Sequence, residues 1–390
     1  MHRARVAWIL ALAASTIPPA APASAEPPPP DRPSWFALYP PPPPGTFTPR
    51  RPPESTATRR PDLFRPVPVY PRSRTVLAEA VLDVRSRPIG ESPRALLVPA
   101  GRLTLDGIVA NPRDGDERGG FRIQWVGDPS SPRADRPDHV RLSEAYAFYK
   151  LLFLGASATI RAGQFVLPFG LAAVYDTTLQ PFETLAGKSV GLRVDSGAMV
   201  EGDYGPFHYA GALTSGRGPN HVDDGGRPVL SARLERHFLT QSGRIQIGGS
   251  MLSGRLPETT PVTFLPVSGI APGTPRIDKT RFSADVQYAV GQLVARGEIV
   301  FGADVDRPVF GYFGEARWNV APRVQGVAGV KRWDYRVRPE SSHVAAVGVD
   351  FVASPGLIVR ALFERERSDG PVAGDPVFDH RLTVQTRIRL

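Results

Sequence analysis

Cysteine is absent from all 390 residues of the sequence. This excludes thiol catalysis, cysteine-based metal sites and disulfides, and it suits an envelope protein that is stable without them. The sequence also has no run of about eighteen apolar residues, although 41% of its residues are hydrophobic, which excludes a helical membrane protein. Lysine occurs four times against 43 arginines, a bias that we attribute to a GC-rich genome.

Signatures of catalysis are missing as well. No Gly-x-Ser-x-Gly, His-Glu-x-x-His or phosphate-cradling glycine loop occurs. Among the seven histidines, His221 lies with Asp223 and Asp224 in a glycine-rich stretch that could hold a metal loosely, although such stretches more often are simply solvated. We predict no catalytic residue, no cofactor and no metal ligand, and we keep an outer-membrane hydrolase that uses His221 as a lesser alternative.

The net charge of +9 is unevenly distributed. The first 74 residues hold ten arginines and four acidic residues, so the remainder has 37 basic against 34 acidic residues. No basic patch is interleaved with stacking aromatics, and we therefore expect no nucleic-acid partner.

The N-terminal part indicates export. Arg3 and Arg5 precede an apolar run over 6–14, and small residues at 23–25 supply a cleavage site, so residues 1–25 are predicted to be a signal peptide. Proline is dense over residues 26–74, which we interpret as a disordered periplasmic segment. It is either a passive linker or a spacer whose arginines contact the cell wall.

From Thr75 onward, apolar and polar residues alternate between turn-forming residues, the pattern of strands. This predicts an all-β domain over 75–390. Sixteen strands are predicted at about 75–87, 102–110, 119–127, 139–153, 157–167, 188–204, 207–215, 228–239, 243–254, 279–289, 292–303, 308–319, 322–336, 342–353, 356–367 and 378–390.

The connections between these strands alternate in length. Short ones of two to four residues, such as Gly205-Pro206 and Ala321-Pro322, are followed by longer ones such as 216–227, 255–278 and 304–307. This asymmetry is typical of a sixteen-stranded antiparallel transmembrane β-barrel with short periplasmic turns and longer extracellular loops. A soluble sandwich or propeller has no reason to sort its loops by length.

The strands have one apolar and one polar face. Phe282, Ala284 and Val286, for example, alternate with Ser283 and Asp285. A charge facing lipid at mid-depth would cost about 2–4 kcal/mol, so the charged faces should line an aqueous lumen, which sixteen strands leave open.

Arginines of these charged faces are the candidate pore-lining residues. Most have an acidic residue two positions away and should brace the wall, whereas Arg161 and Arg387 have none and could create a field that attracts anions. The predicted pore-lining set is Arg161, Arg193, Arg233, Arg296, Arg317, Arg360 and Arg387.

One connection is unusually long. The strand that begins near Ala156 ends at Pro168 and Gly170, and about twenty residues pass before alternation resumes. We predict that 168–187 is a constriction loop that narrows the pore.

Several of these segments together resemble the phosphate-selective porin O and P family. They are EAYAFYK (144–150), RAGQFVLPFGL (161–171), GAMVEGDYG (197–205), SARLE (231–235) and SADVQYAVGQLVARGEIVFG (283–302). The resemblance implies a trimeric sixteen-stranded channel for anions whose third outside loop, 168–187 by strand count, folds into the lumen. The family's rings of arginine and lysine cannot be matched residue by residue, because this chain has only four lysines.

Together these observations predict a porin in the outer membrane of a Gram-negative bacterium. It would pass small hydrophilic solutes passively, with a weak preference for anions, and would contact the lipid bilayer as a homotrimer; the resemblance adds phosphate as the anion. The alternative from another class is a barrel that serves as an anchor or adhesin, with the long loop plugging the lumen.

Overall fold

The computed structural model describes residues 70–86, 95–110, 117–127, 140–153, 156–176, 182–220, 227–240, 243–258, 275–334, 341–354, 356–369 and 377–389. The predicted signal peptide, the proline-rich segment up to residue 69 and the His221 group lie outside these ranges.

Sixteen strands occupy most of the described residues. They are β1 (Tyr70–Ser86), β2 (Ala95–Ala110), β3 (Glu117–Gly127), β4 (Val140–Phe153), β5 (Ala156–Val166), β6 (Val194–Tyr204), β7 (Phe207–Thr214), β8 (Val229–Leu239), β9 (Gly243–Pro257), β10 (Arg276–Val290), β11 (Leu293–Asp304), β12 (Arg307–Ala321), β13 (Val324–Asp334), β14 (Ser341–Ser354), β15 (Leu357–Asp369) and β16 (Val377–Arg389).

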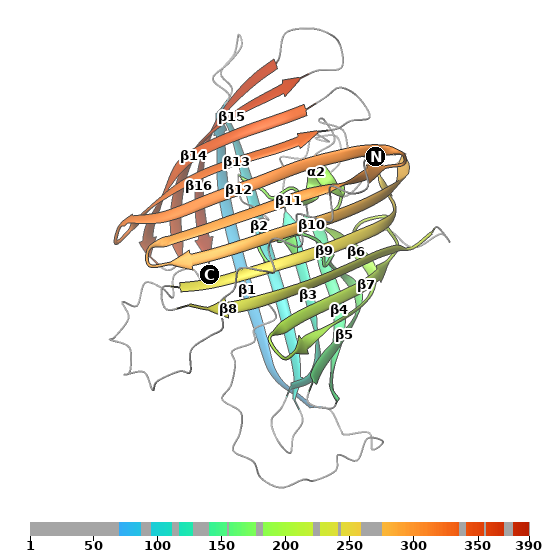
Figure 1. The fold of residues 1–390 in the computed structure, drawn as a ribbon. Coiled ribbons are helices and arrows are strands. Elements are labelled where there is room, and N and C mark those ends of the chain that lie inside the picture. Colours follow the sequence, from blue (N-terminus) through green and yellow to red (C-terminus); the bar gives the residue numbers. More distant parts are fainter. Residues whose placement is uncertain are drawn as a thin grey trace. The chain divides into compact units, whose positions relative to one another are not determined.

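Every strand pairs in antiparallel fashion with its neighbours in the chain (Figure 1). The first and last strands also pair with each other, with Glu79 opposite Arg389 and Ser86 opposite Leu382, so the sheet closes into a barrel. Closure leaves no unpaired edge, which is what allows strands to cross a membrane. The prediction of a sixteen-stranded antiparallel barrel is confirmed.

The two faces of the barrel wall differ as the alternation predicts. On β10, Arg281, Ser283 and Asp285 are buried, whereas Phe282 and Val286 are each 42% exposed. Large apolar side chains are likewise exposed on most other strands, as expected for a barrel face that contacts lipid. The charged residues Arg281 and Asp285 of β10 therefore point inward.

Three strands begin five or more residues away from their predicted starts, among them β2, which begins at Ala95 rather than at 102. The first strand begins at Tyr70 rather than Thr75, so it includes the last residues of the proline-rich stretch. The strand predicted over 188–204 begins only at Val194, because α2 (Ala186–Ser189) and the residues after it belong to the preceding connection. In addition, the connection at 304–307, expected to be longer, is a tight turn through Val305 and Asp306.

The two helical segments are short. They are η2, a 3₁₀ turn over Leu171–Ala173, and α2, which has four residues. No helix within the described ranges has the length and apolar character needed to cross a membrane.

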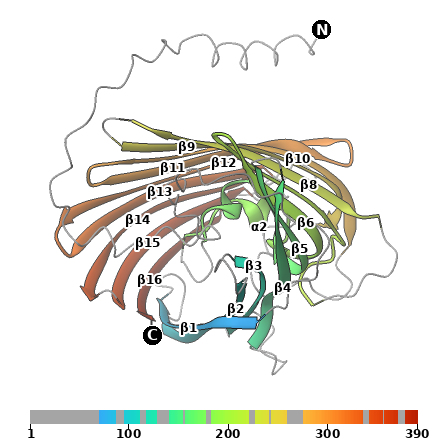
Figure 2. The same cartoon turned by 90° about the horizontal axis from the view of Figure 1, so that it is seen from below.

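Both helical segments lie in the connection between β5 and β6, and Figure 2 shows α2 inside the ring of strands. We call its described residues, 167–176 and 182–193, the lumenal loop. The main apolar cluster of the protein joins this loop to inward-facing residues of the wall. From the loop it includes Leu167, Phe169, Leu171, Tyr175, Phe182, Leu185, Val190 and Leu192, and from the wall Val229, Leu252, Leu256, Val300, Val309, Phe313, Val327, Trp333, Val344, Ala346 and Leu362.

Candidate functional site: the lumenal loop and the wall around it

The lumenal loop leaves and rejoins the wall at one place. The backbone N–H of Leu167 donates to the carbonyl of Arg193 at 2.9 Å, immediately beyond the last ladder pair of β5 and β6. Pro168, which cannot donate to a ladder, follows Leu167 and ends the strand. The intervening chain is thereby released into the lumen as a closed loop.

Apolar packing holds the far part of the loop against the wall. Phe182 is 2% exposed and stacks on Phe313 of β12 with ring centroids 5.3 Å apart. Gly329 of β13 makes room for this ring, since a Cβ there would come within 2.3 Å of Phe182. Burying an aromatic ring in this way contributes about 1.5–3 kcal/mol, so the loop has a driving force to stay against the wall.

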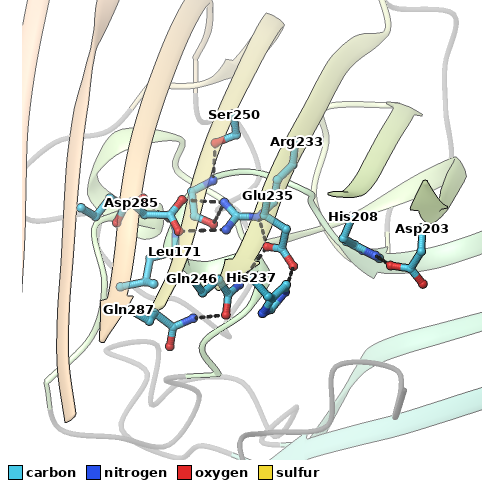
Figure 3. A network of polar contacts seen from close by, with 12 residues as sticks. Leu171, Asp203, His208, Arg233, Glu235, His237, Gln246, Ser250, Asp285 and Gln287 are labelled. Atoms are coloured by element: carbon cyan, nitrogen blue, oxygen red, sulfur yellow. Dashed lines mark hydrogen bonds and ion pairs between the residues drawn. The ribbon is translucent and has the colours of Figure 1, made fainter. Parts of the chain in front are cut away.

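Polar contacts fix the start of the loop. The backbone N–H of Gly170 donates to Oγ of Ser250 at 2.7 Å, and that of Leu171 donates to Oε1 of Glu298 at 2.9 Å. Nη1 of Arg233 donates to the carbonyl of Gly170 at 3.0 Å and also binds Asp285 (Figure 3). Backbone groups that would otherwise be orphaned inside the barrel thus find partners on β8–β11.

Cations of the wall fix the end of the loop. Nε of Arg281 donates to the carbonyl of Ser189 at 2.9 Å, and Nζ of Lys279 donates to that of Val190 at 3.2 Å. Lys188 in turn reaches out from α2 to Oγ of Ser342 at 2.6 Å and to Glu366 at 3.2 Å. Burial lowers the pKa of Lys188 to about 8, and the nearby charge of Lys331 acts in the same direction.

The loop also contacts the wall near β2. Asp176 binds Arg193 at 2.7 Å and forms a second ion pair with Arg102 of β2. Asp176 keeps 23% of its side chain exposed, against 14% for Arg193 and 13% for Arg102. Two arginines therefore meet one loop carboxylate at a partly exposed place in the lumen.

Further charges follow on the same part of the wall. Arg122 of β3 binds Asp106 of β2 at 2.7 Å and lies 4.0 Å from Glu144 of β4. Arg122, Arg193 and Arg161 all attract the Glu144 carboxylate electrostatically. These groups form a polar lining of mixed sign over β2–β6.

The structure places Arg161 differently from the prediction. It lies inward on β5 as expected, but it forms an ion pair with Glu201 of β6 and its guanidinium lies 5.0 Å from the centroid of the Tyr146 ring. The expectation that Arg161 lacks an acidic partner is therefore wrong. That expectation considered acids on the same strand, whereas the partner comes from the neighbouring strand.

The other predicted arginines also lie on the inner face or in the loop. Arg193 ends the lumenal loop, and Arg387 is half-buried on the same face of β16 as the buried Thr383 and Gln385. The remaining four form ion pairs. Two of these pairs lie within one strand, as the spacing of two residues predicts: Arg233 with Glu235 and Arg317 with Glu315. The others join different strands: Arg233 with Asp285, Arg296 with Glu315, Arg317 with Asp350 and Arg360 with Asp350.

Several residues of the site were missed from the sequence. Arg102 follows the same alternation as Thr104 and Asp106 and could have been found from its position on the inward face. The sequence did not show that Asp176 contacts Arg102 or that Glu298 accepts from Leu171, because these partners lie 74 and 127 positions away in the chain. In the described part of the chain, no group of three or more His, Asp or Glu residues could hold a metal ion.

Comparison with known proteins gives a result for structure only. No family model matches the sequence, and no curated protein matches it. Among solved structures, OmpF of Salmonella typhi in complex with daunomycin aligns with a TM-score of 0.58 and 8% identity over 81% of this chain and 97% of its own.

Two further structures are similar over their whole length. An anion-selective porin from Comamonas acidovorans aligns with a TM-score of 0.57 and 10% identity, covering 82% of this chain and 100% of its own. The trimer form of OmpT, an outer membrane protein of Vibrio cholerae, aligns with a TM-score of 0.55 and 12% identity, also over 82% of this chain and 100% of its own. The chain therefore has the β-barrel fold of bacterial outer-membrane porins.

Proposed function

We propose that this protein is an outer-membrane porin through which small hydrophilic solutes diffuse passively. The observation that supports the proposal is a closed barrel whose inner wall is polar and whose lumen holds a loop fixed to one side. Sixteen strands enclose more space than wall side chains can fill, so part of the lumen remains for water.

The side of the lumen left for solutes follows from burial. Wall residues that pack on the loop, such as Arg281 and Val300, are completely buried. By contrast, Arg122 and Asp106 keep 25% and 28% of their side chains exposed. We place the solute path beside the ion pair of Asp176 with Arg102, along the charged wall of β2–β4.

The test is conductance in planar bilayers. A porin gives discrete current steps when the purified protein is added to a phospholipid bilayer in KCl. The competing function is a membrane anchor with a plugged lumen, which is favoured by the contact of Asp176 with Arg102 across the remaining space. An absence of steps, with the protein shown to be inserted, would favour the anchor.

The preference for anions is weak in this proposal. Arg102 and Arg193 outnumber Asp176 at the loop, but arginines elsewhere on the wall are matched by acids. A reversal potential in a KCl gradient should show chloride moderately favoured over potassium. Preference for phosphate is a separate question, and millimolar phosphate should reduce the chloride current if phosphate occupies the constriction.

We also propose a homotrimer, by analogy with the trimer form of Vibrio cholerae OmpT. Mass measurement of the purified protein in detergent by light scattering tests this, and a monomer mass would reject it.

A further inference from the structure

Basic side chains gather on the outer face of the barrel, at the ends of β13–β16 from which the longer connections leave. Arg332 lies directly opposite His343, and His343 lies directly opposite Arg367. One row nearer the middle of the wall, Arg365 lies opposite His380. We call these five residues the outer basic patch.

Their outward orientation follows from the alternation of burial. On β15, Leu362 and Glu364 are buried inside the barrel, whereas Phe363, Arg365 and Arg367 are exposed. The ring of His380 stacks on that of Phe363, with centroids 5.9 Å apart. Arg332 on β13 likewise keeps 38% of its side chain exposed.

The patch lies at the edge of the apolar band. Exposed apolar residues Val330, Val347 and Phe363 lie on the same strands, nearer the middle of the wall. His343 is ten residues from Ala353 at the other end of β14, which at about 3.3 Å per residue and a tilt of about 40° corresponds to roughly 25 Å along the membrane normal. That distance equals the height of the apolar band of such barrels, so the patch is level with lipid headgroups.

The position agrees with what arginine costs on this face. An arginine facing lipid costs about 2–4 kcal/mol at mid-membrane but only about 0–1 kcal/mol near the interface. Arg365 and Arg367 are tolerated where they are because their guanidinium groups reach the polar layer. Within the patch, Asp334 binds Arg332 at 2.9 Å.

We propose that the outer basic patch binds the phosphate groups of a phosphorylated lipid in the leaflet on this side of the membrane. Guanidinium groups match phosphate oxygens in geometry and charge, and two or three of them can share one phosphorylated headgroup. The acyl chains of the same lipid would lie on Val330, Val347 and Phe363. The inference rests on the proposed function in so far as that function places the barrel in a membrane.

The experiment measures lipid binding by the full-length protein in detergent, by native mass spectrometry. The probe is bisphosphorylated lipid A, compared with lipid A from which both phosphates have been removed. The test variant R332Q/R365Q/R367Q removes three charges from the patch. The matched control R236Q/R244Q/R323Q removes three exposed arginines from the opposite end of the barrel.

Wild type and control should bind bisphosphorylated lipid A at least about tenfold more tightly than the test variant, since each arginine near an anionic headgroup contributes roughly fivefold. Wild type should also prefer the phosphorylated over the dephosphorylated lipid. Equal binding by the test variant and the wild type, or equal binding of both lipids, would overturn the proposal.

Two further measurements separate the possible outcomes. Inorganic phosphate at the same phosphate concentration should not displace the lipid, because it gains nothing from the apolar surface; displacement would overturn the assignment to a lipid. Conductance of the test variant in a phospholipid bilayer should equal that of the wild type. If the wild type conducts but its lipid binding does not depend on phosphate, only the proposal for the outer basic patch is rejected. If the wild type binds the lipid but does not conduct, only the proposed porin function is rejected.

Discussion

Asp176 in the lumenal loop forms an ion pair with Arg102 of β2, 74 positions earlier in the chain. The apolar side of the same loop packs against β8–β15, so this pair joins the loop to a second part of the wall, at β2. On the proposed solute path, a solute would pass close to this carboxylate and its two arginines.

Replacing Asp176 with Asn should shift ion selectivity toward anions. The substitution removes the negative charge between Arg102 and Arg193 while it keeps the size of the side chain. The reversal potential in a KCl gradient should move toward the chloride equilibrium potential, and R193Q should move it in the opposite direction. Asp334→Asn removes the same charge from the outer face and should leave the reversal potential unchanged. An equal shift in that variant would show that the effect does not depend on the position of Asp176 in the lumen.

Replacing Gly170 with Ala should loosen the start of the loop. Gly170 has a φ of 62°, and a Cβ there would come within 2.0 Å of Oε1 of Glu298, the acceptor for the N–H of Leu171. Gly205 provides the control, because it has a φ of 57° but nothing within 4 Å of its Cβ position. Both variants bear a backbone cost of about 1–2 kcal/mol, but only G170A also displaces a contact of the loop.

Single-channel recordings distinguish the two glycine variants. G170A should show larger conductance or increased open-channel noise, because the loop no longer stays in one place, whereas G205A should conduct like the wild type. Identical recordings from both variants would show that the contact with Glu298 does not hold the loop.

The sequence predicted the features that depend on a single strand. The inward orientation of Arg281 and Asp285 and the outward orientation of Phe282 follow from the two-residue period, which no tertiary contact can change within a regular strand. Contacts that depend on the register between two strands could not be predicted in the same way. Arg161 pairs with Glu201, and only the register of β5 against β6 brings these residues together.

The loop shows the same limit. Its length and its proline were visible, but the packing of Phe182 on Phe313 depends on a contact between residues 131 positions apart. The alternation over 188–193 was also misleading, since Leu192 is buried in the cluster of the lumenal loop rather than facing lipid. Local alternation cannot distinguish a strand from an irregular segment that is buried on one side.

Replacing Asp350 with Asn should destabilise the barrel strongly. Asp350 is completely buried and binds Arg317 at 3.2 Å and Arg360 at 2.6 Å, so its loss leaves two buried guanidinium groups without this countercharge. Breaking a buried pair in this way costs about 3–5 kcal/mol. Urea unfolding in detergent, followed by tryptophan fluorescence, should show the change, whereas Asp334→Asn on the outer face should cost less than about 1 kcal/mol. Equal stability of the two variants would contradict the role of the buried pairs.

The binding of α2 to the wall through Lys188, which we call the seated state of the loop, should become more stable as the pH rises. When the loop is bound to the wall, the pKa of Lys188 is lowered to about 8, mainly by burial. The charges of Lys331 and Arg381 also lower this pKa, whereas Glu366 raises it. Between about pH 8 and the ordinary lysine pKa of about 10.4, the displaced loop binds more protons than the seated one, so seating gains free energy as the pH increases. Below about pH 8 both forms are protonated and no further change is expected. Open-channel noise recorded from pH 6 to pH 10 should therefore stay constant up to about pH 8 and then fall. K188M, which cannot titrate, should abolish this dependence, and a fall of equal size in K188M would assign the effect to another group.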